Sequence, residues 1–357
     1  MADGKSITKQ ASKFAISERY IRRPNLPKLT RDNDLDLMRF LLAACVVFYH
    51  GKVLIGGLDF PYARISVVSI FLFLSGLLIT ESYYSSPTLK SYAEKRIRRI
   101  YPAYITVVIL GGLIAALGWI FFSAQSVTLA SLGTYWGLNA VFGNWLAPCV
   151  IENAASFSGN CEVNGSLWIM KWEVIFYTLL PVFLMLFSRL HKVIIGIALI
   201  VLTALVSVES SPYMRIFQCF LMGICAYYLK AVWMGWLAKL PPIPHMLRQA
   251  LLVAGFMFSA YIYYGLFILL LMAITFYPSK SGPHINIMKF GDISYGVFLI
   301  HFPLMTGIFQ FLPPEIFGPW GSFAVLGLSS ALAILMHKYI EARFLLPSSY
   351  YRKQAAE

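Results

Sequence analysis

The sequence predicts an all-α, polytopic membrane protein of about ten transmembrane helices, with both termini in the cytoplasm. Three observations predict this fold class. Of the 357 residues, 59% are hydrophobic and 13% are charged, which is about half the charged share of a soluble domain. The apolar stretches are continuous, as in "VVILGGLIAALGWIFF", whereas the strands of a membrane barrel alternate apolar and polar residues. Basic residues gather on alternate connecting segments, which sets the orientation.

A spanning helix needs about 20 predominantly apolar residues. The candidate spans lie roughly at residues 35–56, 65–84, 102–122, 166–187, 193–208, 214–231, 248–262, 264–278, 291–311 and 321–344. The seventh and eighth are short and nearly continuous, and one long helix there would reduce the count to nine. The Gly- and Asn-rich stretch 130–147 is predicted to be interfacial or re-entrant, with an eleventh span as the alternative.

The basic residues test this topology. The net charge is +13, and Lys and Arg cluster in residues 1–34 and in "KRIRR". With ten spans and the N-terminus inside, 24 of the 29 Lys and Arg residues fall on cytoplasmic segments and three, Lys52, Arg64 and Arg215, fall outside. The other two, Arg39 and Lys171, lie within predicted spans. No stacking platform or recognition module accompanies the charge, so we expect it to mark membrane orientation and not nucleic-acid binding.

The chain divides into two tails and one membrane domain. Residues 1–34 are polar and lack the apolar core of a signal peptide, so we expect a cytoplasmic tail. The membrane domain covers 35–346, and 347–357 form a cytoplasmic C-terminal tail. Cys149 and Cys161 share the long outer segment, where they form a disulfide in an oxidising compartment or remain two free thiols.

Ionisable residues inside a predicted span indicate function, because a charge in hydrocarbon is costly. Arg39 and His50 are 11 residues apart, so they share one helix face about 16 Å apart along the axis. That places Arg39 at the inner edge of the membrane and His50 near its middle. The alternatives are an interfacial anchor that pairs Arg39 with Asp36, and a neutral buried imidazole at His50. A functional His50 would transfer protons or act as a nucleophile.

Ser166, Glu173 and Tyr177 form a stripe on the fourth predicted helix, at steps of seven and four residues. Glu173 can orient a histidine, pair with Arg39 or a neighbouring lysine, or accept a proton from a hydroxyl. Trp168, near the outer end, can stack on a sugar or belong to the interfacial aromatic belt.

The ninth predicted helix carries a second intramembrane histidine. Asp292 is predicted to be its N-cap, and Ser294 and His301 share a face seven residues apart. Pro303 cannot donate a backbone hydrogen bond, so it frees a carbonyl near His301.

Arg96 and Arg99 share a helical face in the cytoplasmic loop "KSYAEKRIRRIYP", with Arg98 beside them. Arginine binds phosphates bidentately, so the cluster suits a nucleotide-like donor. On charge alone, contact with anionic lipid or ordinary cytoplasmic charge is the better explanation. The sequence has no metal-ligand spacing, phosphate-binding glycine loop or nucleophile elbow, so we expect no bound cofactor or metal.

In this order, the segments resemble the acyltransferase 3 family of integral membrane acyltransferases. The resemblance runs from about residue 35 to residue 344. Its motifs are "RFLLAACVVFYH", "FLFLSGLLIT", "KRIRRIYP", the Ser-Leu-Trp followed by a Glu before Phe-Tyr, "ISYGVFLIHFP" and "YIEARF". Each motif is short, and their common order makes the resemblance specific.

The resemblance implies transfer of an acyl group, usually acetyl, from cytoplasmic acetyl-CoA as co-substrate. The acceptor would be a hydroxyl of an extracytoplasmic carbohydrate, free or lipid-linked, such as a lipopolysaccharide O-antigen, an exopolysaccharide or a lipooligosaccharide. The location would be a bacterial inner membrane.

The resemblance also implies roles for single residues. His50, Arg39 and Glu173 would be catalytic, with His50 as general base on the acceptor hydroxyl or as carrier of the acetyl group. Donor binding falls to Arg96, Arg98, Arg99 and Ser75, and acceptor binding to Ser166, Trp168, Tyr177 and His301.

Two other functions fit the same sequence. A flippase or exporter of a lipid-linked sugar also has many helices with intramembrane charges, and a requirement for acetyl-CoA distinguishes the two. A structural partner of a polysaccharide synthase would have a degenerate site, and the intact Arg39, His50 and Glu173 argue against it.

Overall fold

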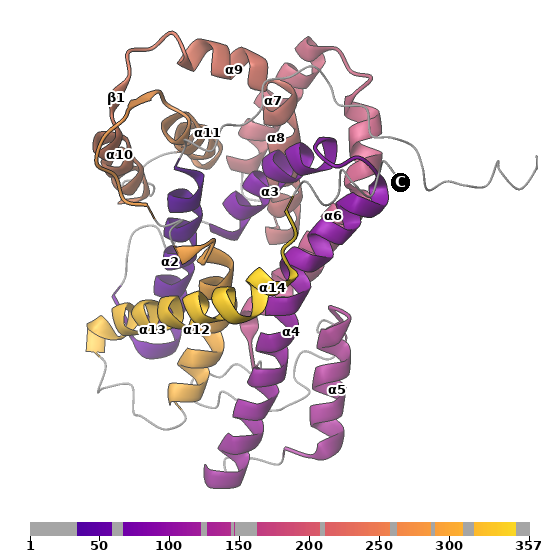
Figure 1. The fold of residues 1–357 in the computed structure, drawn as a ribbon, viewed down its shortest axis with the longest axis vertical. Helices are drawn as coiled ribbons and strands as arrows, with labels where there is room; N and C mark the ends of the chain where they lie inside the picture. The colour runs from indigo at the N-terminus through magenta and orange to yellow at the C-terminus, as the bar shows by residue number, and fades with distance from the viewer. Residues whose placement is uncertain are drawn as a thin grey trace, which may run out of the picture.

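The computed structural model describes residues 34–58, 67–122, 127–143, 146, 163–207, 211–257, 263–286, 290–309 and 318–347. These residues are almost entirely helical, as predicted (Figure 1). Within them, one minimal sheet pairs β1 (Ile243–Pro244) with β2 (Ser279–Lys280) in parallel, with Ile243 opposite Ser279.

The α-helices of the described part follow one another along the chain. They are α2 (Leu35–Ile55), α3 (Val67–Tyr84), α4 (Leu89–Phe122), α5 (Leu129–Ala140), α6 (Met170–Phe187), α7 (Lys192–Ser207), α8 (Pro212–Tyr228), α9 (Lys230–Leu237), α10 (His245–Met257), α11 (Tyr264–Thr275), α12 (Ser294–Phe309), α13 (Gly321–Met336) and α14 (Ala342–Phe344). Short 3₁₀ helices, η4 (Gly165–Ile169) and η8 (Gly318–Trp320), precede α6 and α13, and a π-helical turn, η9 (His337–Glu341), joins α13 to α14.

Several helices are long and apolar enough to cross a bilayer. Five such stretches occur among the described residues, namely Leu35–Ile55, Val67–Tyr84, Leu89–Leu117, Gly165–Phe187 and Gly318–Phe344. α8 and α9 meet at 69° and make a sixth if they form one span. The protein is therefore a multi-pass membrane protein. The count of ten and the side on which the termini lie remain predictions.

The seventh and eighth predicted segments are two helices and not one. A Cβ atom placed on Gly255 of α10 would lie 3.5 Å from the side chain of Leu271 in α11. Such a contact between residues 16 positions apart requires two helices side by side. The pairing of β1 with β2 ties the start of α10 to the end of α11.

The arginine cluster lies on a helix, whereas the sequence suggested a loop. α4 begins at Leu89, runs through Pro102 and contains 34 residues, or about 51 Å at 1.5 Å per residue. This exceeds the roughly 30 Å of the hydrocarbon core, so one end projects beyond it. Lys, Arg and Glu are good helix formers, and Arg98 Nε donates to Glu94 Oε1 one turn earlier at 2.8 Å. The charged residues are therefore compatible with a continuous helix.

The Gly- and Asn-rich stretch contains α5, a helix of 12 residues that packs along α4 (Figure 1). Thr128 and Ser131 cap its start reciprocally. At about 18 Å, α5 is too short to cross the core alone, which favours the re-entrant or interfacial interpretation.

The centre of the bundle depends on close backbone contact between α3 and α8. A Cβ atom on Gly76 would lie 2.2 Å from the carbonyl oxygen of Phe220, and one on Gly223 would lie 2.1 Å from that of Phe73. Small residues allow such contacts between membrane helices. α2 packs in turn against α12 and α13, which brings Arg39 and His50 to the face of α12.

Candidate functional site

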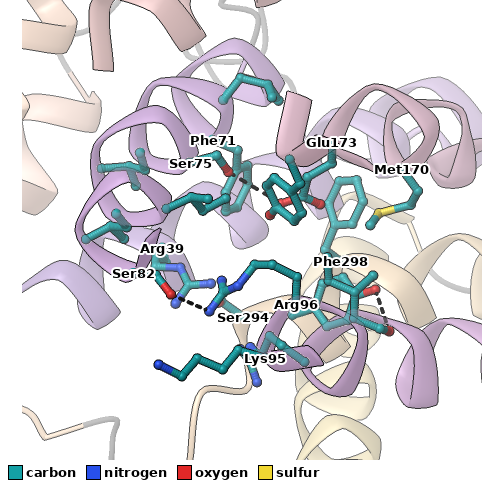
Figure 2. A pocket seen from close by; sticks show the side chains of 18 of the residues that line it. Arg39, Phe71, Ser75, Ser82, Lys95, Arg96, Met170, Glu173, Ser294 and Phe298 are labelled. Carbon is teal, nitrogen blue, oxygen red and sulfur yellow. Dashed lines mark hydrogen bonds between the residues drawn. The ribbon is translucent and has the colours of Figure 1, made fainter. Parts of the chain in front are cut away.

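A cavity of about 480 Å³ lies among α2, α3, α4, α6 and α12 (Figure 2). Its polar wall gathers candidate residues from four helices, α2, α3, α4 and α6. Five cations line it, namely Arg39, Lys95, Arg96, Arg98 and Arg99, against two carboxylates, Glu81 and Glu173. Lys230, which is fully buried, forms an ion pair with Glu81, so this lining carboxylate already has a cationic partner. Lining cations without such a partner attract an anion.

The three arginines of α4 differ in their partners. Arg98 forms an ion pair with Glu94 at 2.8 Å, and Arg99 forms ion pairs with Asp292 and Glu341. Arg96 donates from Nη2 to Ser82 Oγ at 3.0 Å. Among the described residues it has no carboxylate partner, and its buried Nε has no hydrogen-bond partner. Arg96 is thus the arginine of this cluster whose charge remains available to a ligand.

Asp292 holds two arginines in place. Its Oδ2 accepts from Arg39 Nη1 and Arg99 Nη2, and its Oδ1 accepts from Ser294 Oγ at 2.6 Å. The prediction of Asp292 as an N-cap was wrong, because α12 begins only at Ser294. Asp36, the predicted partner of Arg39, is 3.9 Å away, so the shorter ion pair to Asp292 dominates.

Glu341 extends this network to the end of the chain. Its Oε2 accepts from Arg99 Nη1 at 2.9 Å and lies 3.2 Å from His337 Nδ1. The residue is 1% exposed and belongs to the π-helical turn η9, a feature often found at functional sites. Sequence reasoning missed the roles of Asp292 and Glu341. The only signal for Glu341 was its place in the final motif.

Glu173 faces the cavity from α6 together with two hydroxyls. Tyr177 Oη donates to Glu173 Oε1, and Ser75 Oγ of α3 donates to the same oxygen at 3.4 Å. Glu173 and Tyr177 are therefore neighbours on one stripe, as predicted. Tyr177 was predicted to bind the acceptor, and it lies at the cavity with the predicted donor residues.

The two intramembrane histidines form a second cluster. His50 Nδ1 lies 2.8 Å from His301 Nε2, and the rings stack with centroids 5.1 Å apart. Ser166 Oγ lies 3.4 Å from the same His301 nitrogen. His301 is fully buried and His50 partly buried. Neither histidine lines the cavity, so the predicted catalytic set of His50, Arg39 and Glu173 divides between two clusters.

Two phenylalanines lie between the clusters. Phe71 and Phe298 both line the cavity, and their ring centroids are 6.0 Å apart (Figure 2). The Phe298 ring lies 6.1 Å from the ring of His301, one helical turn further along α12. Phe298 thus lies between the cationic cavity and His301, with Phe71 packed against it, and we call these two rings the partition.

The remaining predicted residues lie apart from both clusters or outside the described part. Trp168 contacts the ring of Tyr213 edge-on, with centroids 6.2 Å apart, and does not line the cavity. Cys149 and Cys161 lie outside the described residues.

Comparison with known proteins gives a consistent result. The family model described as "Acyltransferase domain" matches residues 32–338. The chain is similar to Nodulation protein 10 of Rhizobium leguminosarum bv. viciae, with 24% identity over 316 residues that cover 76% of this chain and 83% of that protein. It is 24% identical over 360 residues to the peptidoglycan O-acetyltransferase OatA of Listeria monocytogenes, covering 86% of this chain and 54% of that protein. The chain thus spans about half the length of the Listeria relative.

A third similarity is short. An uncharacterized protein of Haemophilus influenzae is 46% identical over 55 residues, 15% of this chain and 22% of that protein. No solved structure matches the chain. Because the family model covers most of its length, the chain belongs to the acyltransferase 3 family and is an acyltransferase.

Proposed function

We propose that the protein is a membrane O-acetyltransferase. It takes an acetyl group from cytoplasmic acetyl-CoA and transfers it to a hydroxyl of an extracytoplasmic carbohydrate. The Listeria relative, named as a peptidoglycan O-acetyltransferase, supports oxygen as the accepting atom and a carbohydrate as the acceptor. The distribution of basic residues supports ten spans with both termini in the cytoplasm of a bacterial inner membrane.

The observation that carries this proposal is that Arg96 lies in a cationic cavity, has no carboxylate partner in the described part of the chain, and has an Nε without a hydrogen-bond partner there. CoA is an anion with several phosphate groups, and arginine binds phosphate with two parallel hydrogen bonds. Arg96 is free to make such bonds, whereas Arg98 and Arg99 already have carboxylate partners. In this proposal Arg96 binds the phosphate groups of the donor directly. Arg98 and Arg99 add to the positive electrostatic potential around these phosphates, and Ser75 lines the path of the acyl arm.

The thioester must then travel from the cavity to His50. The partition of Phe71 and Phe298 lies on this route, so it opens or lets the narrow acyl arm pass. His50 removes the proton of the acceptor hydroxyl, or accepts the acetyl group and passes it on. In either case the carbon–sulfur bond breaks, the acceptor oxygen forms the new ester, and the proton leaves with the CoA thiol.

In this proposal the acceptor approaches His50 from the side opposite the cavity. His50 is partly exposed, so an acceptor can reach it, whereas His301 is fully buried. Ser166 lies beside the histidines and can contact the acceptor. Trp168, which lies in η4 just before the start of α6 and packs on Tyr213, offers an aromatic surface for a sugar ring. We place Tyr177 with the donor, because it faces the cavity with Glu173.

The test is binding and turnover of radiolabelled acetyl-CoA by the purified protein in nanodiscs. Arg96→Ala should weaken binding roughly tenfold or more, because a charge-assisted hydrogen bond contributes about 1.5–3 kcal/mol. Arg189→Ala is the matched control, since Arg189 is an exposed cation just after α6 and does not line the cavity. It should bind acetyl-CoA as the wild type does.

Two results would overturn the proposal. The first is a well-folded wild-type protein that binds no acyl-CoA, and this would favour an exporter of lipid-linked sugars. The second is equal acetyl-CoA affinity of Arg96→Ala and Arg189→Ala, which would remove the donor from this cavity.

A further inference from the structure

The hydrogen bonds around His301 determine which nitrogen of His50 carries a proton. His301 Nδ1 lies 3.1 Å from the carbonyl oxygen of Val297. A carbonyl oxygen can only accept, so Nδ1 of His301 must carry the hydrogen. The opposite tautomer would set two lone pairs against each other at that distance.

This assignment fixes the rest of the pair. A neutral imidazole with a proton on Nδ1 has a bare Nε2, which accepts hydrogen bonds. His301 Nε2 lies 2.8 Å from His50 Nδ1, so His50 Nδ1 must donate. His50 then carries its single proton on Nδ1, and its Nε2 lone pair has no hydrogen-bond partner among the described residues.

The local sequence holds His301 in this position. Pro303 has no backbone N–H and leaves the carbonyl of Leu299 without its helical partner. Asn164 Nδ2 donates to that carbonyl at 3.0 Å, and Asn164 Oδ1 accepts from the backbone N–H of Ser166 at 3.0 Å. One asparagine therefore joins the start of η4 to α12 beside His301.

Ser166 is the weaker partner of His301. Its hydroxyl lies 3.4 Å from His301 Nε2, near the limit of a hydrogen bond. The contact from His50, at 2.8 Å, is the shorter of the two. Loss of the serine hydroxyl should leave the orientation of His50 intact.

We propose that His301 is a positioning residue that holds His50 as the Nδ1–H tautomer and leaves Nε2 of His50 as the reacting atom. This rests on the proposed function only in making His50 the reacting group. The partner of an imidazole nitrogen commonly fixes both the tautomer and the orientation of the ring. Here a neutral histidine fills the place that a carboxylate fills in a hydrolytic triad.

The first measurement is the tautomer itself. The protein is labelled with ¹⁵N-histidine in nanodiscs, and the His50 signals are assigned by their loss in His50→Asn. Protonated and bare ring nitrogens resonate in separate regions of the spectrum. We expect Nδ1–H and a bare Nε2 for His50 in the wild type and in Ser166→Ala, and a shift toward Nε2–H in His301→Leu. A wild-type His50 with its proton on Nε2 would overturn the proposal whatever the activity.

The second measurement is activity with acetyl-CoA. His301→Leu should lower kcat roughly 10- to 100-fold, with KM for acetyl-CoA unchanged. The size is taken by analogy from metal-binding histidines that lose the group orienting their ring. His301→Gln keeps an accepting oxygen and should recover most of kcat, and the loss in His301→Leu then cannot be a packing defect. Equal kcat in folded His301→Gln and His301→Leu would contradict positioning. The expected tautomer without any acyl-CoA turnover would leave the positioning intact and overturn the proposed function.

Discussion

The cationic cavity and the histidine pair lie on either side of Phe298, and they are held together by different interactions. In the cavity, ion pairs set the arrangement, because Asp292 and Glu341 hold Arg39 and Arg99. Arg96 has no carboxylate partner among the described residues. At the histidine pair, the described contacts are hydrogen bonds between imidazoles, a hydroxyl and a carbonyl, and none of them is an ion pair. The two regions are therefore suited to different tasks.

This difference separates the binding of the donor from the proton transfer during the reaction. Fixed cations favour a polyanion before any reaction occurs, whereas a neutral imidazole with a free lone pair can take a proton during the reaction. Arg39 and His50 belong to the same helix, three turns apart. α2 thus connects the two regions. Mutations in its first half should change acetyl-CoA affinity, and mutations in its second half should change kcat.

The largest expected effect is on the chemical step. His50→Ala should lower kcat roughly 10²–10⁴-fold, the usual cost of losing a positioned base, and leave acetyl-CoA affinity unchanged. The measurement is turnover and binding of radiolabelled acetyl-CoA in nanodiscs, with thermal unfolding as a check of folding. A parallel loss of acetyl-CoA affinity would show that the two regions are not separate.

The next effect is on stability. Asp292→Ala leaves Arg39 and Arg99 facing each other without their shared carboxylate. The loss of one partner of a fully buried ion pair costs about 3–5 kcal/mol, and these partly buried pairs should cost less. We expect a clear fall in the melting temperature in detergent. Asp36→Ala is the matched control, since Asp36 lies 3.9 Å from Arg39, and it should melt near the wild type. Equal melting temperatures would mean that Asp292 does not hold the arginines.

Local periodicity predicted the neighbours within each helix. Arg39 and His50 do face α12 from one side of α2, and Glu173 and Tyr177 are bonded one turn apart. Regular helix geometry alone determines which residues share a face of one helix, so the sequence was sufficient to predict these neighbours. The all-helical membrane fold followed in the same way from continuous apolar runs.

Contacts between distant segments could not be predicted. Asp292 binds Arg39 across 253 positions of the chain, and His50 meets His301 across 251. No periodicity in one helix shows which residue of another helix will face it. The helical start of α4 was missed for a different reason, because charge marked a loop while the helix propensity of the same residues favoured continuation.

A smaller effect distinguishes the contribution of the positive charge of Arg96 from that of its planar guanidinium group. Arg96→Lys keeps the cation and loses the planar fork, so acetyl-CoA affinity should fall roughly tenfold, or about 1.4 kcal/mol. The affinity should remain sensitive to salt, because the lysine keeps the cation at this position. Titration at two ionic strengths measures both properties. Unchanged affinity in Arg96→Lys would show that only the charge matters at this position.

The smallest effect concerns the partition between the regions. Phe298→Leu shortens one of the two rings that the acyl group must pass, so longer acyl groups should gain relative to acetyl. A pocket discriminates one methylene by about 1–3 kcal/mol at most, and a leucine removes only part of that barrier. We expect the ratio of kcat/KM for butyryl-CoA to that for acetyl-CoA to rise several-fold. Phe256→Leu is the matched control, because Phe256 packs on Phe267 between α10 and α11, away from the cavity. If both variants keep the wild-type ratio, the acyl group reaches His50 by a route that avoids Phe298, and the two regions connect elsewhere.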